Sequence, residues 1–128
     1  MKEQGIYNQL SAWLKLQHPN VIWRWDYGAG QKMSVGMAMR MKKMQCGVSY
    51  PDLFIAKPNG KYAGCFIEVK LDDVEIYQKR DGLKFATPHL QAQAECMDRL
   101  RKEGYYAEFG RGFENCKQQI QFYLTGKL

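Results

Sequence analysis

The sequence has no apolar run that approaches the roughly 20 residues needed to span a membrane. It also opens without a charged segment followed by an apolar leader. These two absences predict a soluble protein of the cytoplasm that has no membrane partner. Internal repeats, linker-like segments and low-complexity tracts are missing as well, which excludes collagen-like, coiled-coil and disordered chains. We therefore expect residues 1–128 to form one domain.

Cysteine and histidine are too few and too scattered to build a structural zinc site. None of the four cysteines belongs to a Cys-x-x-Cys pair, and His18 and His89 are not spaced as partner ligands. An even number of cysteines is compatible with disulfides, but nothing in the sequence signals secretion. We therefore expect all four side chains to be reduced thiols, most of them buried.

Positive charge is concentrated in the first part of the chain. The net charge is +6, and residues 1–50 contain seven basic and two acidic side chains, whereas the two charge types nearly balance over residues 51–128. A basic region beside a charge-balanced one is typical of a surface that binds a polyanion such as nucleic acid. The alternative is a basic surface that is merely solvated.

Hydrophobic periodicity and turn signals predict the element order α-β-α-β-β-α-β-α. Helices are expected at 3–17, 35–46, 88–103 and 113–124, and strands at 21–25, 53–56, 62–71 and 105–109. Residues 72–84 have no clear period and are expected to form a loop. Strands that alternate with helices predict an α/β fold with a central mixed sheet flanked by helices.

A methionine series marks the second predicted helix. Its spacing favours adaptable packing against the core over a metal or lipid site. The members are Met33, Met37, Met39, Met41 and Met44.

The predicted hairpin of the third and fourth strands brings three charged side chains together. Asp52 lies at the start of the first strand, and Glu68 and Lys70 lie on one face of the second, because side chains alternate along a strand. The start of one hairpin strand lies beside the end of the other, so Asp52 is expected near Glu68 and Lys70. Two carboxylates in an apolar setting predict a Mg²⁺ site. The alternative is a surface salt bridge between Glu68 and Lys70.

Pro51-Asp52 followed by Glu68-Val69-Lys70 matches the PD-(D/E)xK nuclease pattern, a short motif with many chance matches. The order of the surrounding segments makes a chance match less plausible. Glu3 opens a helix, Gly28-Ala29-Gly30 precedes a basic helix, and a glutamine-bearing helix follows the hairpin. Over nearly its whole length the chain resembles the VRR-NUC nuclease domain, particularly its small stand-alone phage or bacterial versions. One departure is Thr87-Pro88, where such domains often carry Leu-Ser, although Thr87 can cap the helix equally well.

The resemblance implies a restriction-endonuclease-like fold and the Mg²⁺-dependent hydrolysis of DNA phosphodiesters, with Mn²⁺ as a substitute. By position it makes Asp52, Glu68 and the Val69 carbonyl metal ligands, and Glu3 an acidic residue that reaches the metal directly or through water. Lys70 would orient or help deprotonate the attacking water, and Gln91 would position Lys70 or the phosphate. Taken alone, Glu3 is explained nearly as well as a carboxylate favoured by the helix dipole.

The stand-alone members are homodimers that cut branched DNA, so four-way junctions are the expected substrate, with no nucleotide cofactor. The interface candidates are the Met-rich helix and Trp23, Trp25 and Tyr27, unless these residues pack inside one subunit or line the DNA cleft. DNA phosphates are expected to contact Lys32, Arg40, Lys42 and Lys43. Two alternatives remain open: a non-catalytic DNA-binding module of the same fold, and a nuclease that nicks ordinary duplex.

Overall fold

The computed structural model describes residues 2–26 and 33–127. The elements follow the predicted order, with boundaries shifted by a few residues. They are α1 (Glu3–Gln17), β1 (Trp23–Trp25), α2 (Val35–Lys43), β2 (Leu53–Ile55), β3 (Cys65–Lys70), α3 (Pro88–Lys102), β4 (Tyr106–Arg111) and α4 (Gly112–Thr125). In the part of the chain that the structure describes, no helix combines the length and apolar character needed to cross a membrane.

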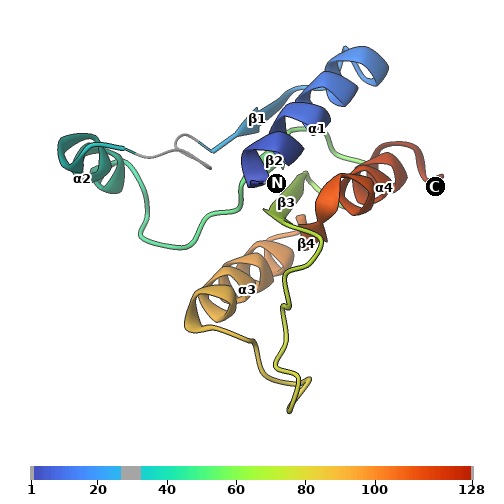
Figure 1. Ribbon diagram of the computed structural model, residues 1–128. Helices are drawn as coiled ribbons and strands as arrows, with labels where there is room; N and C mark the ends of the chain where they lie inside the picture. Colours follow the sequence, from blue (N-terminus) through green and yellow to red (C-terminus); the bar gives the residue numbers. More distant parts are fainter. Residues whose placement is uncertain (1, 27–32, 128) are drawn as a thin grey trace.

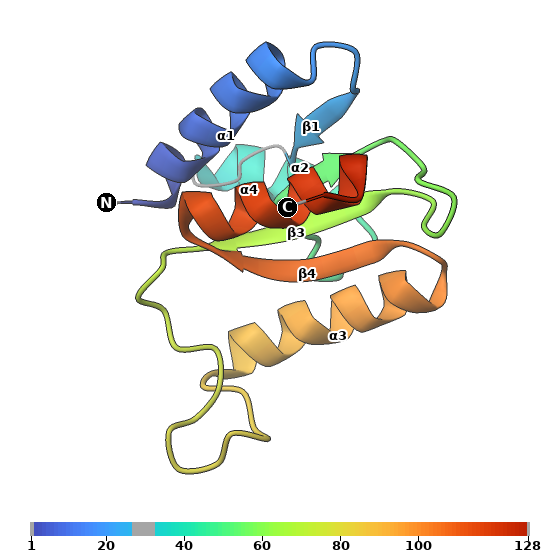
Figure 2. The ribbon, with the colours of Figure 1, turned by 90° about the vertical axis from the view of Figure 1, so that its right-hand side faces the viewer.

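The four strands form one mixed sheet in the order β1-β2-β3-β4. β2 pairs antiparallel with both β1 and β3, whereas β3 pairs parallel with β4. Figure 2 shows α1 and α4 on one face of the sheet and α3 on the other. The prediction of an α/β fold with a central mixed sheet flanked by helices is confirmed.

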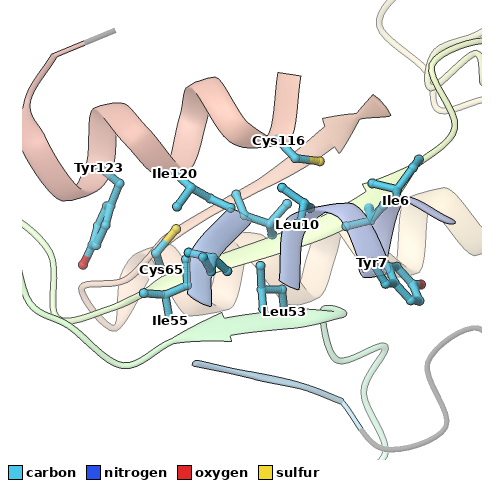
Figure 3. Close-up of a cluster of buried hydrophobic side chains, with 12 residues drawn as sticks. Ile6, Tyr7, Leu10, Leu53, Ile55, Cys65, Cys116, Ile120 and Tyr123 are labelled. Carbon is cyan, nitrogen blue, oxygen red and sulfur yellow. The ribbon is translucent and has the colours of Figure 1, made fainter. Parts of the chain in front are cut away.

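Alternation along β3 divides its side chains between two cores. Cys65, Ile67 and Val69 are fully buried against α1 and α4. Figure 3 shows this core, with Tyr7 of α1 at one end and Tyr123 of α4 at the other. Phe66 points to the opposite face and belongs to the core beneath α3. Because both faces of β3 are covered, any charged side chain on this strand is placed against apolar surroundings.

The connection between β2 and β3 is longer than predicted, because the Asn59 side chain takes hydrogen bonds that would otherwise belong to the strand pairing. The Asn59 Oδ1 atom accepts hydrogen bonds from the backbone N–H groups of Lys61 (3.0 Å) and Tyr62 (2.7 Å). Gly60, at φ +88°, supplies the left-handed residue of the turn. The Tyr62 amide is thereby used in the turn, and β3 begins at Cys65 rather than at residue 62.

The Met-rich helix departs from its prediction. Ser34 caps α2 through a hydrogen bond from the Met37 N–H to its hydroxyl, but the helix ends at Lys43 and contains no buried residue. Met39 is 58% exposed and Met44 74%. The last turn carries Arg40, Lys42 and Lys43, which interrupt any continuous apolar face. Figure 1 shows α2 beside the sheet rather than stacked on a face of it. The expectation that the methionines pack as core residues is wrong.

The segment between β3 and α3 is irregular, as predicted, and projects from the molecule as an arm (Figures 1 and 2). A single bridge pairs Tyr77 with Phe85, and their rings stack with centroids 5.1 Å apart. The Ala86 N–H donates to the Ile76 carbonyl at 2.9 Å, and Ile76 anchors the arm in the core beneath α3. At the tip, Leu83 is 93% exposed.

The cysteines follow the prediction closely. All four are free thiols, and Cys65, Cys96 and Cys116 are buried, whereas Cys46 is exposed.

Candidate active site

The hairpin register brings Asp52 and Glu68 together. Leu53 pairs with Ile67 at the end of the β2–β3 ladder, so Asp52 and Glu68 are the next opposed positions. The Asp52 Oδ2 atom accepts a hydrogen bond from the Val69 N–H at 2.9 Å, which continues the ladder by one bond beyond the last residue of β2. The Val69 side chain is buried in the core. Asp52 is therefore fixed against the backbone of the strand that carries Glu68 and Lys70.

Glu68 is buried to an extent that is unusual for a carboxylate. Its exposed fraction is 3%, and its Oε1 atom accepts a hydrogen bond from the Gln93 Nε2 atom of α3 at 2.8 Å. Burial first, and then hydrogen bonding to and the charge of Asp52, raise the pKa of Glu68 to about 10, although the Lys70 charge opposes the shift. At neutral pH and without a cation the buried carboxyl therefore holds its proton.

Lys70 and Glu3 complete the charged cluster. Lys70 is partly buried at the end of β3, on the same face as Glu68. Burial raises the pKa of Glu3, the Lys70 charge lowers it, and the Asp52 charge raises it. The first residue of α1 therefore lies close enough to the hairpin for the charges of Lys70 and Asp52 to act on it. The surface salt bridge considered from the sequence does not describe Glu68, which is buried and bound to Gln93.

Tyr7 is a site residue that the sequence did not reveal. It is buried, and its hydroxyl donates to the Glu3 Oε1 atom at 3.4 Å. Burial raises its pKa, and the charges of Asp52, Glu3 and Glu68 act in the same direction. The phenol is thus kept protonated as a hydrogen-bond donor among three carboxyl groups. The spacing of four residues from Glu3, on the core-facing side of α1, is the signal that could have identified it.

The glutamine at this site is Gln93, not Gln91. Gln91 is exposed, and its Nε2 atom donates to Glu95 at 3.1 Å. Gln93 is buried and bonded to Glu68. Leu90 and Met97 are buried on the same helix, and residues 90, 93 and 97 share one face at helical spacing. That periodicity alone could have placed Gln93 on the face that meets the sheet. The resemblance had assigned Gln91 instead.

A buried oxygen of Gln93 has no partner. Among the described residues, no donor lies within hydrogen-bonding distance of the Gln93 Oε1 atom. A buried amide oxygen without a partner is costly. It lies on the side chain whose amide nitrogen holds Glu68, so a water or substrate group that supplied a donor here would be bound next to that carboxyl.

Three of the predicted DNA-binding residues lie on α2, an element that contributes no residue to this cluster. Arg40, Lys42 and Lys43 are exposed in the last turn of that helix. Lys32 and the preceding glycine-rich segment lie outside the described residues.

The oxygen donors of the cluster suit a hard divalent cation. Among the described residues, no group of three or more His, Cys, Asp or Glu side chains is placed to hold a metal ion by itself. Mg²⁺ in proteins is usually held by one or two carboxylates and keeps several waters. Asp52 and Glu68 provide that number, and a cation between them would offset the Asp52 charge that helps to raise the pKa of Glu68. The residues present therefore fit the ion.

Comparison with known proteins supports the fold. The chain is similar to a solved structure described as a VRR_NUC domain protein, with 26% sequence identity and a TM-score of 0.64. The match covers 99% of this chain and 91% of the other. No family model and no curated protein matches the sequence. The resemblance inferred from the sequence is confirmed by a match that spans nearly the whole of both chains.

Proposed function

We propose that this chain, whose fold is that of the VRR-NUC domain, is a metal-dependent endonuclease that hydrolyses phosphodiester bonds in DNA. The observation that carries this proposal is the buried carboxyl of Glu68, placed against Asp52 and Lys70 at the end of the central hairpin. Two carboxyl groups this close in a buried setting ionise together only when a positive charge is bound between them. A divalent cation that also contacts the reacting phosphate would supply that positive charge.

Each residue of the cluster has a task in that reaction. Asp52 and Glu68 would hold Mg²⁺ or Mn²⁺ together with the Val69 carbonyl, and Glu3 would contribute through water. When bound, the ion would lower the pKa of water and offset the negative charge of the phosphate. Lys70 would orient the attacking water and stabilise the charge that develops on the phosphate. Tyr7 and Gln93 would keep the carboxyl groups in place.

Incubation with labelled DNA tests the proposal. Four-way junction, flap, single-stranded and linear duplex DNA are each mixed with the protein in Mg²⁺, Mn²⁺, Ca²⁺ or EDTA. We expect cleavage with Mg²⁺ and Mn²⁺ only, because Ca²⁺ is larger and activates water poorly. Binding without cleavage in every metal would favour the non-catalytic module, and cleavage in EDTA would contradict the metal site.

Four-way junctions are the substrate we propose, cut by a homodimer in the cytoplasm of a bacterial or phage-infected cell. One subunit has one hairpin site, whereas resolving a junction requires two coordinated incisions. Trp25 already packs within its own subunit, because its ring centroid lies 4.4 Å from that of Tyr7 and its Nε1 atom donates to the Ser11 hydroxyl. Trp23 also packs against the subunit's own core, and Tyr27 lies outside the described residues.

The methionines of α2 are the remaining candidate for the dimer interface, since Met39 of that helix is exposed. Sedimentation at working concentration distinguishes a dimer from a 15 kDa species that makes paired cuts by itself.

Gln93→Leu should reduce the cleavage rate by roughly 10- to 100-fold, the usual effect of removing a partner that orients a metal ligand. The apolar side chain of similar size removes the hydrogen bond to Glu68 and keeps the packing of α3 against the sheet. Gln91→Leu, two residues away on the exposed face, is the matched control and should leave the rate unchanged. The measurement is single-turnover cleavage, with thermal unfolding run on both variants. A loss of rate confined to Gln91→Leu would return the assignment to the residue chosen from the sequence.

The cations of α2 should bind DNA phosphates. In the variant with Arg40, Lys42 and Lys43 all changed to alanine, the slope of log affinity against log salt should fall by about 0.9 for each phosphate that is no longer neutralised. Binding is measured by fluorescence anisotropy in EDTA at several salt concentrations. The matched control changes Lys57, Lys61 and Lys127 to alanine, three exposed cations at the far end of the hairpin and near the end of the chain. Equal slopes in the two variants would move the DNA surface away from α2.

A further inference from the structure

An apolar cavity lies immediately beside the proposed active site. Its volume is about 440 Å³, and it is open to solvent and lined by residues of β1, the end of α2, the segment between α2 and β2, and β2 itself. Aromatic and methionine side chains supply most of the wall, and charged groups stand at its edge. The main wall residues are Trp25, Tyr50, Phe54, Met41 and Met44, with Arg24 and Asp26 at the edge.

The cavity shares its backbone with the carboxylate pair. The Asp26 N–H donates to the Asp52 carbonyl at 2.7 Å, and Tyr50 precedes Asp52 by only two residues. The backbone segment that carries Asp52 therefore also forms part of the cavity wall.

The walls of the cavity suit a flat aromatic ligand. Phe54 stacks on Phe66 with centroids 4.5 Å apart, and Tyr50 meets Phe66 edge-on at 5.4 Å, so both rings are supported by a third. Tyr50 is still 43% exposed and leaves part of its ring open to a ligand. Supported aromatic rings form stacking surfaces for bases, and methionine adapts to either a purine or a pyrimidine.

Basic side chains outnumber acidic ones around the cavity, which favours a ligand that carries negative charge. Arg24 and Asp26 stand at the edge of the cavity. The last turn of α2, which carries the wall residue Met41, also carries three basic side chains: Arg40, Lys42 and Lys43. A nucleotide combines a flat ring with flanking phosphates, which matches this arrangement.

We propose that the cavity binds one unpaired nucleobase of the DNA strand, next to the phosphate that is cleaved. The inference rests on the proposed nuclease function and names the feature of the substrate that the site selects. A base inside a duplex must first leave the stack, which costs a few kcal/mol, whereas a base at a branch or in a bulge is already free. The cavity therefore makes the protein prefer DNA that has an unpaired base at the cutting position.

Binding in EDTA tests the proposal without relying on cleavage. Three labelled duplexes of equal length are compared by fluorescence anisotropy: one fully paired, one with a single bulged base, and one with a bulged abasic residue. We expect the bulged base to bind roughly tenfold more tightly than the abasic bulge, because base stacking on aromatic side chains contributes that much. Equal affinity for these two DNAs would overturn the proposal.

Two variants locate the effect. Tyr50→Ala removes the open stacking ring, and Met44→Glu places a charge in the cavity at a position exposed enough to leave folding intact. Both should abolish the preference for the base over the abasic bulge. Phe122→Ala, which removes an exposed aromatic ring from α4, is the control and should keep it. A preference that survives in Met44→Glu would place the base elsewhere.

Cleavage of the same DNAs in Mg²⁺ separates this proposal from the nuclease function. Cleavage without base preference would leave the nuclease standing and remove the base site. Base preference without cleavage of any DNA would leave the base site standing and remove the nuclease.

Discussion

Lys70→Ala should lower the rate of DNA cleavage by about a thousandfold or more, because groups that stabilise charge or move a proton in the transition state each contribute about that much. Affinity for DNA measured in EDTA should change by only a few fold, since the side chain is partly buried and serves the chemical step. Single-turnover cleavage and anisotropy, run on the same preparation, measure the two quantities.

The same hairpin offers a matched control. Lys57→Ala removes an exposed lysine at the other end of β2, far from the carboxyl groups, and should leave both quantities unchanged. Asp52→Asn, which keeps an oxygen for the Val69 N–H, should lose cleavage like Lys70→Ala. Undiminished cleavage in both Lys70→Ala and Asp52→Asn would remove the proposed site.

The buried carboxyl should make the metal-free protein lose stability as the pH rises. The folded-state pKa of Glu68 is about 10, above the value of about 4.3 expected in the unfolded chain. A group whose pKa is higher in the folded state makes its full contribution to the free energy of unfolding when the pH is below its unfolded pKa. That contribution is lost as the pH rises towards the folded pKa. The loss between pH 5 and 9 should be on the order of 1 kcal/mol per pH unit.

Glu68→Gln should remove this loss, because the amide is neutral at every pH and keeps the shape of the side chain. Chemical denaturation in EDTA across pH 5–9 measures the free energy of unfolding of each variant. The control is Glu95→Gln, at an exposed position, which should behave as the unmodified protein. Adding Mg²⁺ at pH 8 should raise the melting temperature of the unmodified protein and not that of Glu68→Gln. Parallel pH profiles for the two variants would show that Glu68 is ionised without metal.

The hairpin could be predicted from the sequence because its signals are local. Asn59-Gly60 marks the turn, apolar residues mark the two strands, and strand alternation places Glu68 and Lys70 on one face. The proximity of Asp52 then follows from antiparallel pairing alone, and the register confirms it. The resemblance contributed Glu3, which composition and spacing would not have separated from an ordinary first-turn carboxylate.

Other parts could not be predicted because they depend on tertiary contacts. The methionines of α2 have the spacing of a packed helix, but no part of the described fold buries them. The choice between Gln91 and Gln93 depends on which face of α3 meets the sheet. The periodicity of Leu90 and Met97 contained that information, whereas the identity of the residue against that face, Glu68, is a long-range contact 25 positions away.

The hydrogen bond from the Val69 N–H to Asp52 has a consequence for affinity. A carboxylate on a free side chain must lose rotational freedom when it binds an ion, and that loss weakens binding. Asp52 loses this freedom during folding instead, because one of its oxygens is already bonded to the backbone of β3. Its second oxygen is consequently preorganised for a single-point contact, so binding an ion there requires little further ordering of the side chain.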